Sequence, residues 1–282
     1  MIRIITDSAA DMEKEELEKY SITSIPLSVS FGEKNYLDGV DLDKEKFYEL
    51  LKTEKEFPKT SQPSPEAFLA EFKAALDAGD EVIAILLSGG LSGTMQSALI
   101  AKELCGGEGI YIVDSLLATG GEKALVLYAA ELAQKGMGAA EIAEMTEKLR
   151  DRSRLVAGLD TLEYLCKGGR LSKTAAGIGT LANIKPIIKL TPEGTVALAE
   201  KCLGRKSMMG RLVKYLDKTG IDKSLPLYFL YSKDRGNCEE FMERLGEKGY
   251  PVENAVVTNI GSTIGAHVGE GAFGVVYFVP EE

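Results

Sequence analysis

Histidine is almost absent from this sequence, which contains only one, His267, among 282 residues. The four cysteines are scattered, with no Cys-x-x-Cys pair and no histidine at a spacing that would complete a zinc site. We therefore expect no bound metal, and in a large cytoplasmic chain we expect no disulfide framework either. The surroundings of this single histidine therefore need an explanation.

Positively charged residues are fewer than negatively charged ones. The chain has 33 lysines and arginines and 43 aspartates and glutamates, which gives a net charge of −10. Proteins that bind the phosphate backbone need a positive surface, so we expect no nucleic-acid partner. No apolar run approaches the roughly 20 residues that span a bilayer. The first residues, MIRIITDSAADMEKEE, lack the apolar core of a signal peptide, which predicts a cytoplasmic location.

Apolar strands alternate with helical segments in the first half of the chain. Strands are predicted over IRIITDS (2–8), EVIAILLS (81–88) and GIYIVDS (109–115), and a further strand over residues 21–31. The continuous apolar run of 81–88 indicates burial on both faces. Helices are predicted over residues 9–20, 92–104, 117–136 and 138–153. This alternation is typical of a parallel sheet with covered faces.

The pattern changes after about residue 150, where short strands and a polar turn at Pro192-Glu193-Gly194 follow, with no flexible linker. In this half, helices are predicted over residues 207–220 and 237–249, and strands over residues 226–232, 254–261 and 274–280. We predict an α/β protein of two domains. Residues 1–152 form an N-terminal α/β domain with a mainly parallel sheet, and residues 153–282 form a C-terminal α+β domain.

Two polar loops have the composition of ligand-binding segments. PKTSQPSPEAF (58–68) is a stiff turn, and a helix cap within it does not explain Thr60, Ser61 and Gln62. LLSGGLSGTMQSA (86–98) leads from a buried strand through a glycine turn into a helix, whose first amides attract anions. No Walker-type Gly-Lys-Ser/Thr sequence follows, so we expect no nucleoside triphosphate. Structural and ligand-binding roles stay open for both loops.

His267 lies in IGAHVGEGAFG (264–274), which we interpret as a glycine-rich loop before the last strand. Its imidazole either donates to an acidic ligand or is an ordinary packed side chain. An enzymatic alternative is a serine hydrolase or acyltransferase that uses Ser92 and His267, because Ser92 lies in a near match to the GxSxG motif. Thr94 replaces the last glycine of that motif. Arg170, in CKGGRLS, either binds an anion, docks a partner or stays solvated.

A set of short motifs runs in a fixed order through nearly the whole chain. The motifs are IITDSAAD, IPLSVSF, LDGVDL, KTSQPSP, LSGGLSGTMQSA, YIVDS, LCKGGRLSKTAAGIGTLANIKPII and IGAHVGEGAFGVVYF. Each alone is a weak signal, but the set in this order is highly specific. By these motifs the chain resembles the DegV family of bacterial fatty-acid-binding proteins.

The resemblance implies a fatty acid in a tunnel at the interface of two domains. The carboxyl-binding positions of the family correspond to Thr60, Ser61, Ser92 and His267. A buried carboxylate needs several donors in place of water, and the amides of Gly93 and Thr94 would add to this set. Apolar helix faces over 117–132 and 174–188 are candidate walls for the acyl chain, although core packing explains them equally well.

Family members of this type present the bound acyl group to an ATP-dependent fatty acid kinase and have no ATP site of their own. The resemblance therefore implies a lipid-binding protein without catalytic activity, with no cofactor, with a long-chain fatty acid as ligand and with transient membrane contact. Arg170 and Arg205 correspond to its kinase-docking surface. The chain departs from the family pattern at two positions, since Leu203 replaces the first arginine of Arg-x-Arg and Gly89 replaces a loop serine.

Overall fold

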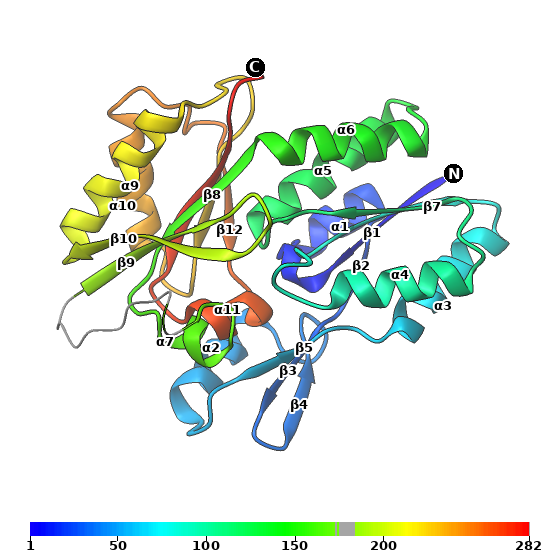
Figure 1. The fold of residues 1–282 in the computed structure, drawn as a ribbon, viewed down its shortest axis with the longest axis horizontal. Helices are drawn as coiled ribbons and strands as arrows, with labels where there is room; N and C mark the ends of the chain where they lie inside the picture. Colours follow the sequence, from blue (N-terminus) through cyan, green and yellow to red (C-terminus); the bar gives the residue numbers. More distant parts are fainter. Residues whose placement is uncertain (173, 175–183, 282) are drawn as a thin grey trace.

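The computed structural model describes residues 1–172, 174 and 184–281, and its first sheet is entirely parallel. The strand order is β2 (Thr23–Ile25), β1 (Ile2–Asp7), β6 (Glu81–Leu86) and β7 (Ile110–Asp114). Figure 1 shows this sheet on the right of the molecule. The parallel sheet predicted from the alternation of strands and helices is confirmed.

Helices cover both faces of this sheet, as the apolar run of β6 predicted. Ile83 and Ile85 face a core formed with α1 (Lys14–Tyr20), α5 (Gly120–Gln134) and α6 (Ala139–Arg152). The alternate side chains of Val82 and Ala84 face α3 (Pro65–Asp77) and α4 (Thr94–Leu104). The helix predicted from residue 9 begins only at Lys14, because residues 8–10 form a short 3-10 turn, in which Asp7 accepts a hydrogen bond from the amide of Ala9.

A small antiparallel sheet lies below the parallel one in Figure 1 and interrupts a predicted strand. Its order is β4 (Lys34–Leu37), β3 (Ser28–Phe31) and β5 (Lys59–Ser61). The single strand expected over 21–31 is two strands in different sheets, β2 and β3. Pro26 lies between them and cannot donate to a ladder. Helix α2 (Lys44–Thr53), which was not predicted from the sequence, packs against β3 through Phe47 and Tyr48.

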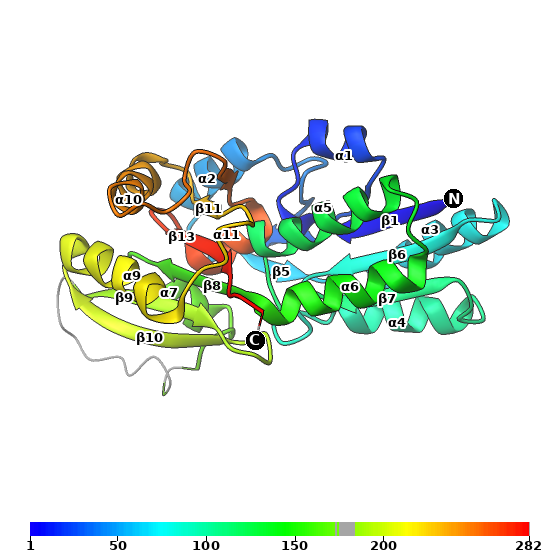
Figure 2. The same cartoon turned by 90° about the horizontal axis from the view of Figure 1, so that it is seen from above.

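The third sheet is mixed and begins at Ser153. Its order is β10 (Val196–Leu203), β9 (Ile184–Leu190), β8 (Ser153–Gly158), β13 (Phe273–Phe278), β11 (Tyr228–Tyr231) and β12 (Val256–Asn259). One face packs against α9 (Arg205–Thr219) and α10 (Gly236–Gly246), which both figures place on the side away from the parallel sheet (Figures 1 and 2). The change of sheet coincides with the predicted boundary at 152/153, and the division into domains stays a prediction.

The other face of the mixed sheet shares a core with the parallel sheet. Leu155, Ala157 and Leu230 belong to the same buried cluster as Ile83 and Ile85. The two halves of the chain are therefore joined by one continuous apolar core. Part of the wall predicted over 174–188 lies outside the described residues. No helix within the described ranges has the length and apolarity that a bilayer crossing requires.

At Gly274, strand β13 packs so closely against strand β8 that no side chain fits, and replacing this glycine tests that packing. A Cβ there would lie 2.5 Å from the carbonyl oxygen of Val156 and 2.7 Å from Cβ of Ala157. We expect Gly274→Ala to lower the free energy of unfolding by about 1–3 kcal/mol in a urea titration, since backbone must shift. Gly210→Ala in α9 is the control. A Cβ meets nothing within 4 Å there, so we expect a gain of about 0.5–1 kcal/mol. Equal effects would contradict the packing argument.

Candidate functional site

A pocket lies where the ends of the parallel strands meet the inner face of the mixed sheet. Leu87 and Ala118 line it from the segments that follow β6 and β7. Leu155 and Ile188 line it from β8 and β9 on the opposite side. The carboxyl ends of parallel strands are a common place for ligands in α/β proteins. Both halves of the chain are needed to form this pocket.

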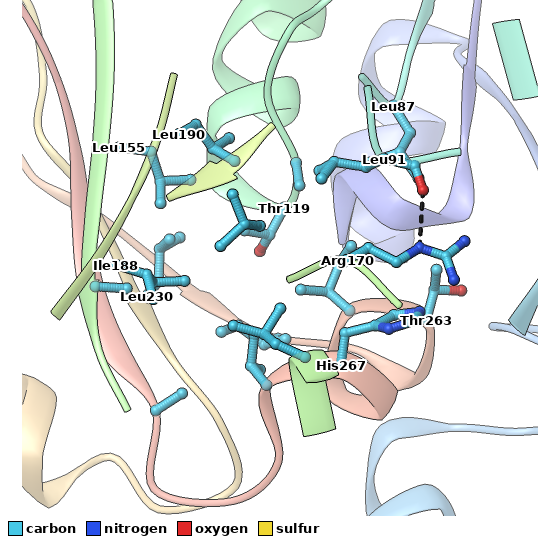
Figure 3. A pocket seen from close by; sticks show the side chains of 18 of the residues that line it. Leu87, Leu91, Thr119, Leu155, Arg170, Ile188, Leu190, Leu230, Thr263 and His267 are labelled. Carbon is cyan, nitrogen blue, oxygen red and sulfur yellow. Dashed lines mark hydrogen bonds between the residues drawn. The ribbon is translucent and has the colours of Figure 1, made fainter. Parts of the chain in front are cut away.

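Most polar side chains of the pocket gather toward one side, whereas Thr119 lies between the two sides (Figure 3). Among the described residues, the polar lining consists of Thr60, Ser92, Thr119, Arg170, Thr263 and His267. Figure 3 shows Arg170, Thr263 and His267 together, with Leu155 and Leu190 on the opposite side of the cavity. A pocket with one polar and one apolar end suits an elongated amphipathic molecule.

His267 lies in the last turn of helix α11 (Ser262–Val268), so the interpretation of this segment as a loop was wrong. Glycine is a poor helix former, and for that reason the sequence resembles a loop. In the structure, Gly265 is where α11 packs on α2, since a Cβ there would lie 2.6 Å from Cε1 of Phe47. Gly269 ends the helix with φ of 72°. These glycines allow helices to pack closely, rather than bringing backbone to a ligand.

The imidazole of His267 is buried and neutral at ordinary pH. Its Nε2 lies 2.8 Å from Oγ1 of Thr60. Burial, and then the nearby charge of Arg170, lower the pKa of His267 to about 4. Nδ1 has no hydrogen-bond partner within the described part of the protein. It faces Gly168, where a Cβ would lie 2.2 Å from it, so the first glycine of the GGR turn makes room for the ring.

Thr60 and Ser61 point in opposite directions because they are neighbours on strand β5. Thr60 lines the pocket and contacts His267, whereas the side chain of Ser61 is exposed and does not line it. Successive side chains of a strand alternate between the two faces. The family resemblance implied that both hydroxyls bind the carboxyl group, but the structure brings only Thr60 to the pocket.

The turn after β6 presents Ser92 to the pocket. Oδ2 of Asp7, at the end of β1, accepts a hydrogen bond from the amide of Leu87 at 2.9 Å and so holds the start of this turn. Ser92 Oγ lies 2.9 Å from Oγ1 of Thr94, which is buried behind it. A Cβ at Gly93 would lie 1.9 Å from Oε1 of Gln62, so this glycine lets the two polar loops pack together. Gly93 and Thr94 support Ser92 without lining the pocket themselves.

Arg170 and Arg205, predicted to share a docking surface, have different surroundings. Arg170 lines the pocket, and its guanidinium donates to the carbonyl of Leu91 (2.9 Å) and of Gly168 (2.6 Å). Arg205 is exposed and forms an ion pair with Asp160 at 3.1 Å. The positive charge of Arg170 therefore belongs to the polar end of the pocket.

Two buried carboxylates that sequence reasoning left without a role hold the start of α11. Asp38, in the LDGVDL motif, accepts hydrogen bonds from the hydroxyls of Ser262 (2.5 Å) and Thr263 (2.6 Å). Asp11, in IITDSAAD, accepts one from the amide of Gly261 at 2.8 Å. Carboxylates stabilise helix N-termini by accepting from their free donors. The signal in the sequence was the pair of acidic motifs, but nothing in it indicated which helix they cap.

Comparison with known proteins agrees with this fold. A model of the DegV family, described as uncharacterised proteins, matches residues 1–279. The chain belongs to the DegV family. A DegV domain-containing protein of Caldanaerobacter subterraneus is 36% identical over 276 residues, which cover 98% of each chain.

Solved structures of DegV family proteins have the same fold. A fatty-acid-binding member from Thermus thermophilus is similar with a TM-score of 0.90 and 31% identity, over 99% of both chains. A stearic-acid-binding protein from Eubacterium ventriosum has a TM-score of 0.87 and 28% identity, over 99% of this chain and 98% of that one. The predicted α/β fold class is confirmed, whereas the tunnel between two domains stays a prediction.

Because this DegV protein has one histidine, its imidazole gives a single assignable NMR signal. We expect that signal to titrate with a pKa of about 4 in the ligand-free protein, well below the ordinary value of 6.5. The folded state then binds fewer protons than the unfolded state between these values, so His267 favours unfolding as the pH falls from about 6.5 to 4. The control is the protein unfolded in urea, where the same signal should titrate normally. A pKa near 6.5 in the folded protein would contradict the burial of the ring.

Proposed function

We propose that this protein binds one long-chain fatty acid in the pocket and presents its carboxyl group to an ATP-dependent fatty acid kinase, which forms the acyl phosphate. The carboxyl group lies at the polar end, near Thr60, Ser92, Arg170 and His267. The acyl chain extends toward Leu155 and Leu190. The protein acts as a carrier and does not itself transform its ligand.

The separation of polar and apolar lining is the observation that supports this proposal most directly. Each buried methylene contributes about 0.8 kcal/mol of transfer free energy, so the chain supplies affinity. A carboxylate removed from water needs charged or hydrogen-bonding partners. Arg170 supplies a positive charge, and Thr60 and Ser92 supply hydroxyl groups, while the neutral ring of His267 holds the hydroxyl of Thr60 through Nε2.

The relatives support the same ligand class. The DegV family protein from Thermus thermophilus is described as binding fatty acids, and the protein from Eubacterium ventriosum as binding stearic acid. The structural similarity extends over nearly the whole of this chain in both cases. A saturated chain of that length is therefore the first ligand to test.

The hydrolase alternative finds no support in the geometry. A serine nucleophile needs a histidine base at hydrogen-bonding distance and a carboxylate behind it. Nε2 of His267 is paired with Thr60, and Ser92 is paired with Thr94. Within the described residues, no carboxylate is hydrogen-bonded to Nδ1. These contacts favour hydrogen bonding to a ligand over proton transfer.

Calorimetric titration with stearate tests the proposed head-group site. We expect Thr60→Val, Ser92→Ala and His267→Gln each to weaken binding by about 1–3 kcal/mol, the cost of a lost buried hydrogen bond. Ser61→Ala is the matched control, because the exposed side chain of Ser61 lies on the same strand as Thr60 and outside the pocket. Stearate should also raise the pKa of His267, since a carboxylate favours the imidazolium. Absence of binding in the unaltered protein would overturn the proposal.

The proposed docking of a kinase is tested separately, at residues on the outer surface of the protein. Arg205 begins helix α9, and the neighbouring Leu203 is 73% exposed, so both are accessible to a partner. We expect Arg205→Ala to reduce acyl-phosphate formation by a fatty acid kinase several-fold without changing the affinity for stearate, because a charge at the rim of an interface affects association. Arg211→Ala, on the same helix, is the control. Equal activity of both variants would remove Arg205 from the docking surface.

A further inference from the structure

The mixed sheet has a split between two of its central strands. The antiparallel pairing of β8 with β9 runs from Gly158↔Ile187 to Val156↔Lys189 and ends there. Beyond this point β8 stays paired with β13, and β9 stays paired with β10. Leu155 and Leu190 would form the next pair but are not joined by the ladder. The strands therefore diverge at these two leucines.

The split lies at the apolar end of the fatty-acid pocket and faces a second cavity. Leu155 and Leu190 line the pocket described above and also a neighbouring cavity. Figure 3 shows both leucines on the side of the pocket opposite His267. A chain that extends from the polar end toward these leucines would thus point at the second cavity.

The second cavity differs from the first in its charge. Three cations line it, namely Arg150, Arg154 and Lys189, with one carboxylate, Asp151. Arg150 is paired with Asp151 at 3.0 Å. Arg154 donates to the carbonyls of Asp151 (2.9 Å) and Ser153 (2.7 Å), which carry no charge.

Lys189 adds a second cation that is left without a neutralising partner. No ion pair between described residues includes Lys189, which lines the cavity, and its strand register places it opposite Val156, beside the split. Arg154 and Lys189 thus give the second cavity an excess of positive charge. Such a cavity favours an anionic group over a methyl group.

We propose that the split between Leu155 and Leu190 is a window at the tail end of the pocket, and that the cavity beyond it is a subsite for an anionic group at the far end of the ligand. The protein would then accept α,ω-dicarboxylic acids of long chain in addition to ordinary fatty acids. This inference rests on the proposed fatty-acid-binding function.

The cost of burying a charge makes the binding of a dicarboxylic acid depend on the length of its chain. A second carboxylate that stops inside the apolar pocket loses its water and finds no partner, which is costly. A chain long enough to pass the two leucines brings that carboxylate to Arg154 and Lys189 while its methylenes remain buried. Short dicarboxylic acids are therefore rejected, and long ones are accepted.

Paired calorimetric titrations with stearate and octadecanedioic acid test the window. We expect the unaltered protein to bind the diacid within about tenfold of stearate. The double variant R154Q/K189Q should weaken the diacid by about tenfold, since two partly exposed charge pairs together are worth about one tenfold step. Its affinity for stearate should change less than twofold. Lys214→Gln is the control for loss of charge, because Lys214 is exposed on α9 and does not line the cavity.

A second variant tests the window itself. Leu190→Phe should narrow the split and weaken the diacid more than stearate. The inference is overturned if the unaltered protein binds the diacid a hundredfold more weakly than stearate, or if the double variant weakens both acids equally. It is also overturned if K214Q has the same effect as the double variant. Failure of stearate itself to bind would instead reject the proposed function, and the inference with it.

Discussion

Helix α11 is held at its N-terminus by carboxylates from the other half of the chain, and the polar end of the pocket depends on this attachment. Asp11 and Asp38 accept from the first residues of the helix, and the last turn of the same helix carries His267. A helix of seven residues has little stability of its own. Its position therefore comes from these carboxylates and from packing on α2.

The pocket is formed by segments that belong to, or follow, strands of all three sheets. Loops at the ends of the parallel strands supply Ser92, β5 supplies Thr60, and the mixed sheet supplies the apolar wall. Because one apolar core continues between the parallel and mixed sheets, packing sets how far apart the two sides of the pocket lie. Burial in this setting keeps His267 neutral, so Arg170 is the cation at the polar end.

The sequence predicted helices and strands well where one apolar pattern was clear along a segment. The apolar run of β6 indicated burial on both faces, and the helix after it was located within a few residues. Errors arose where tertiary contacts override local preference. Gly265 lowers the helix propensity of α11, yet it is the residue that lets the helix approach Phe47. Pro26 divides what looked like one strand between two sheets.

By itself, the sequence determined the α/β class, the parallel sheet and the motifs that contain Thr60, Ser92 and His267, because these follow from periodicity and motif order. Only the tertiary structure decided which of their side chains share a pocket. Strand alternation turns Ser61 outward, and the GGR turn directs Arg170 inward to the ring of His267. The split between Leu155 and Leu190 likewise arises from the divergence of two strands, a property of pairing that no single segment encodes.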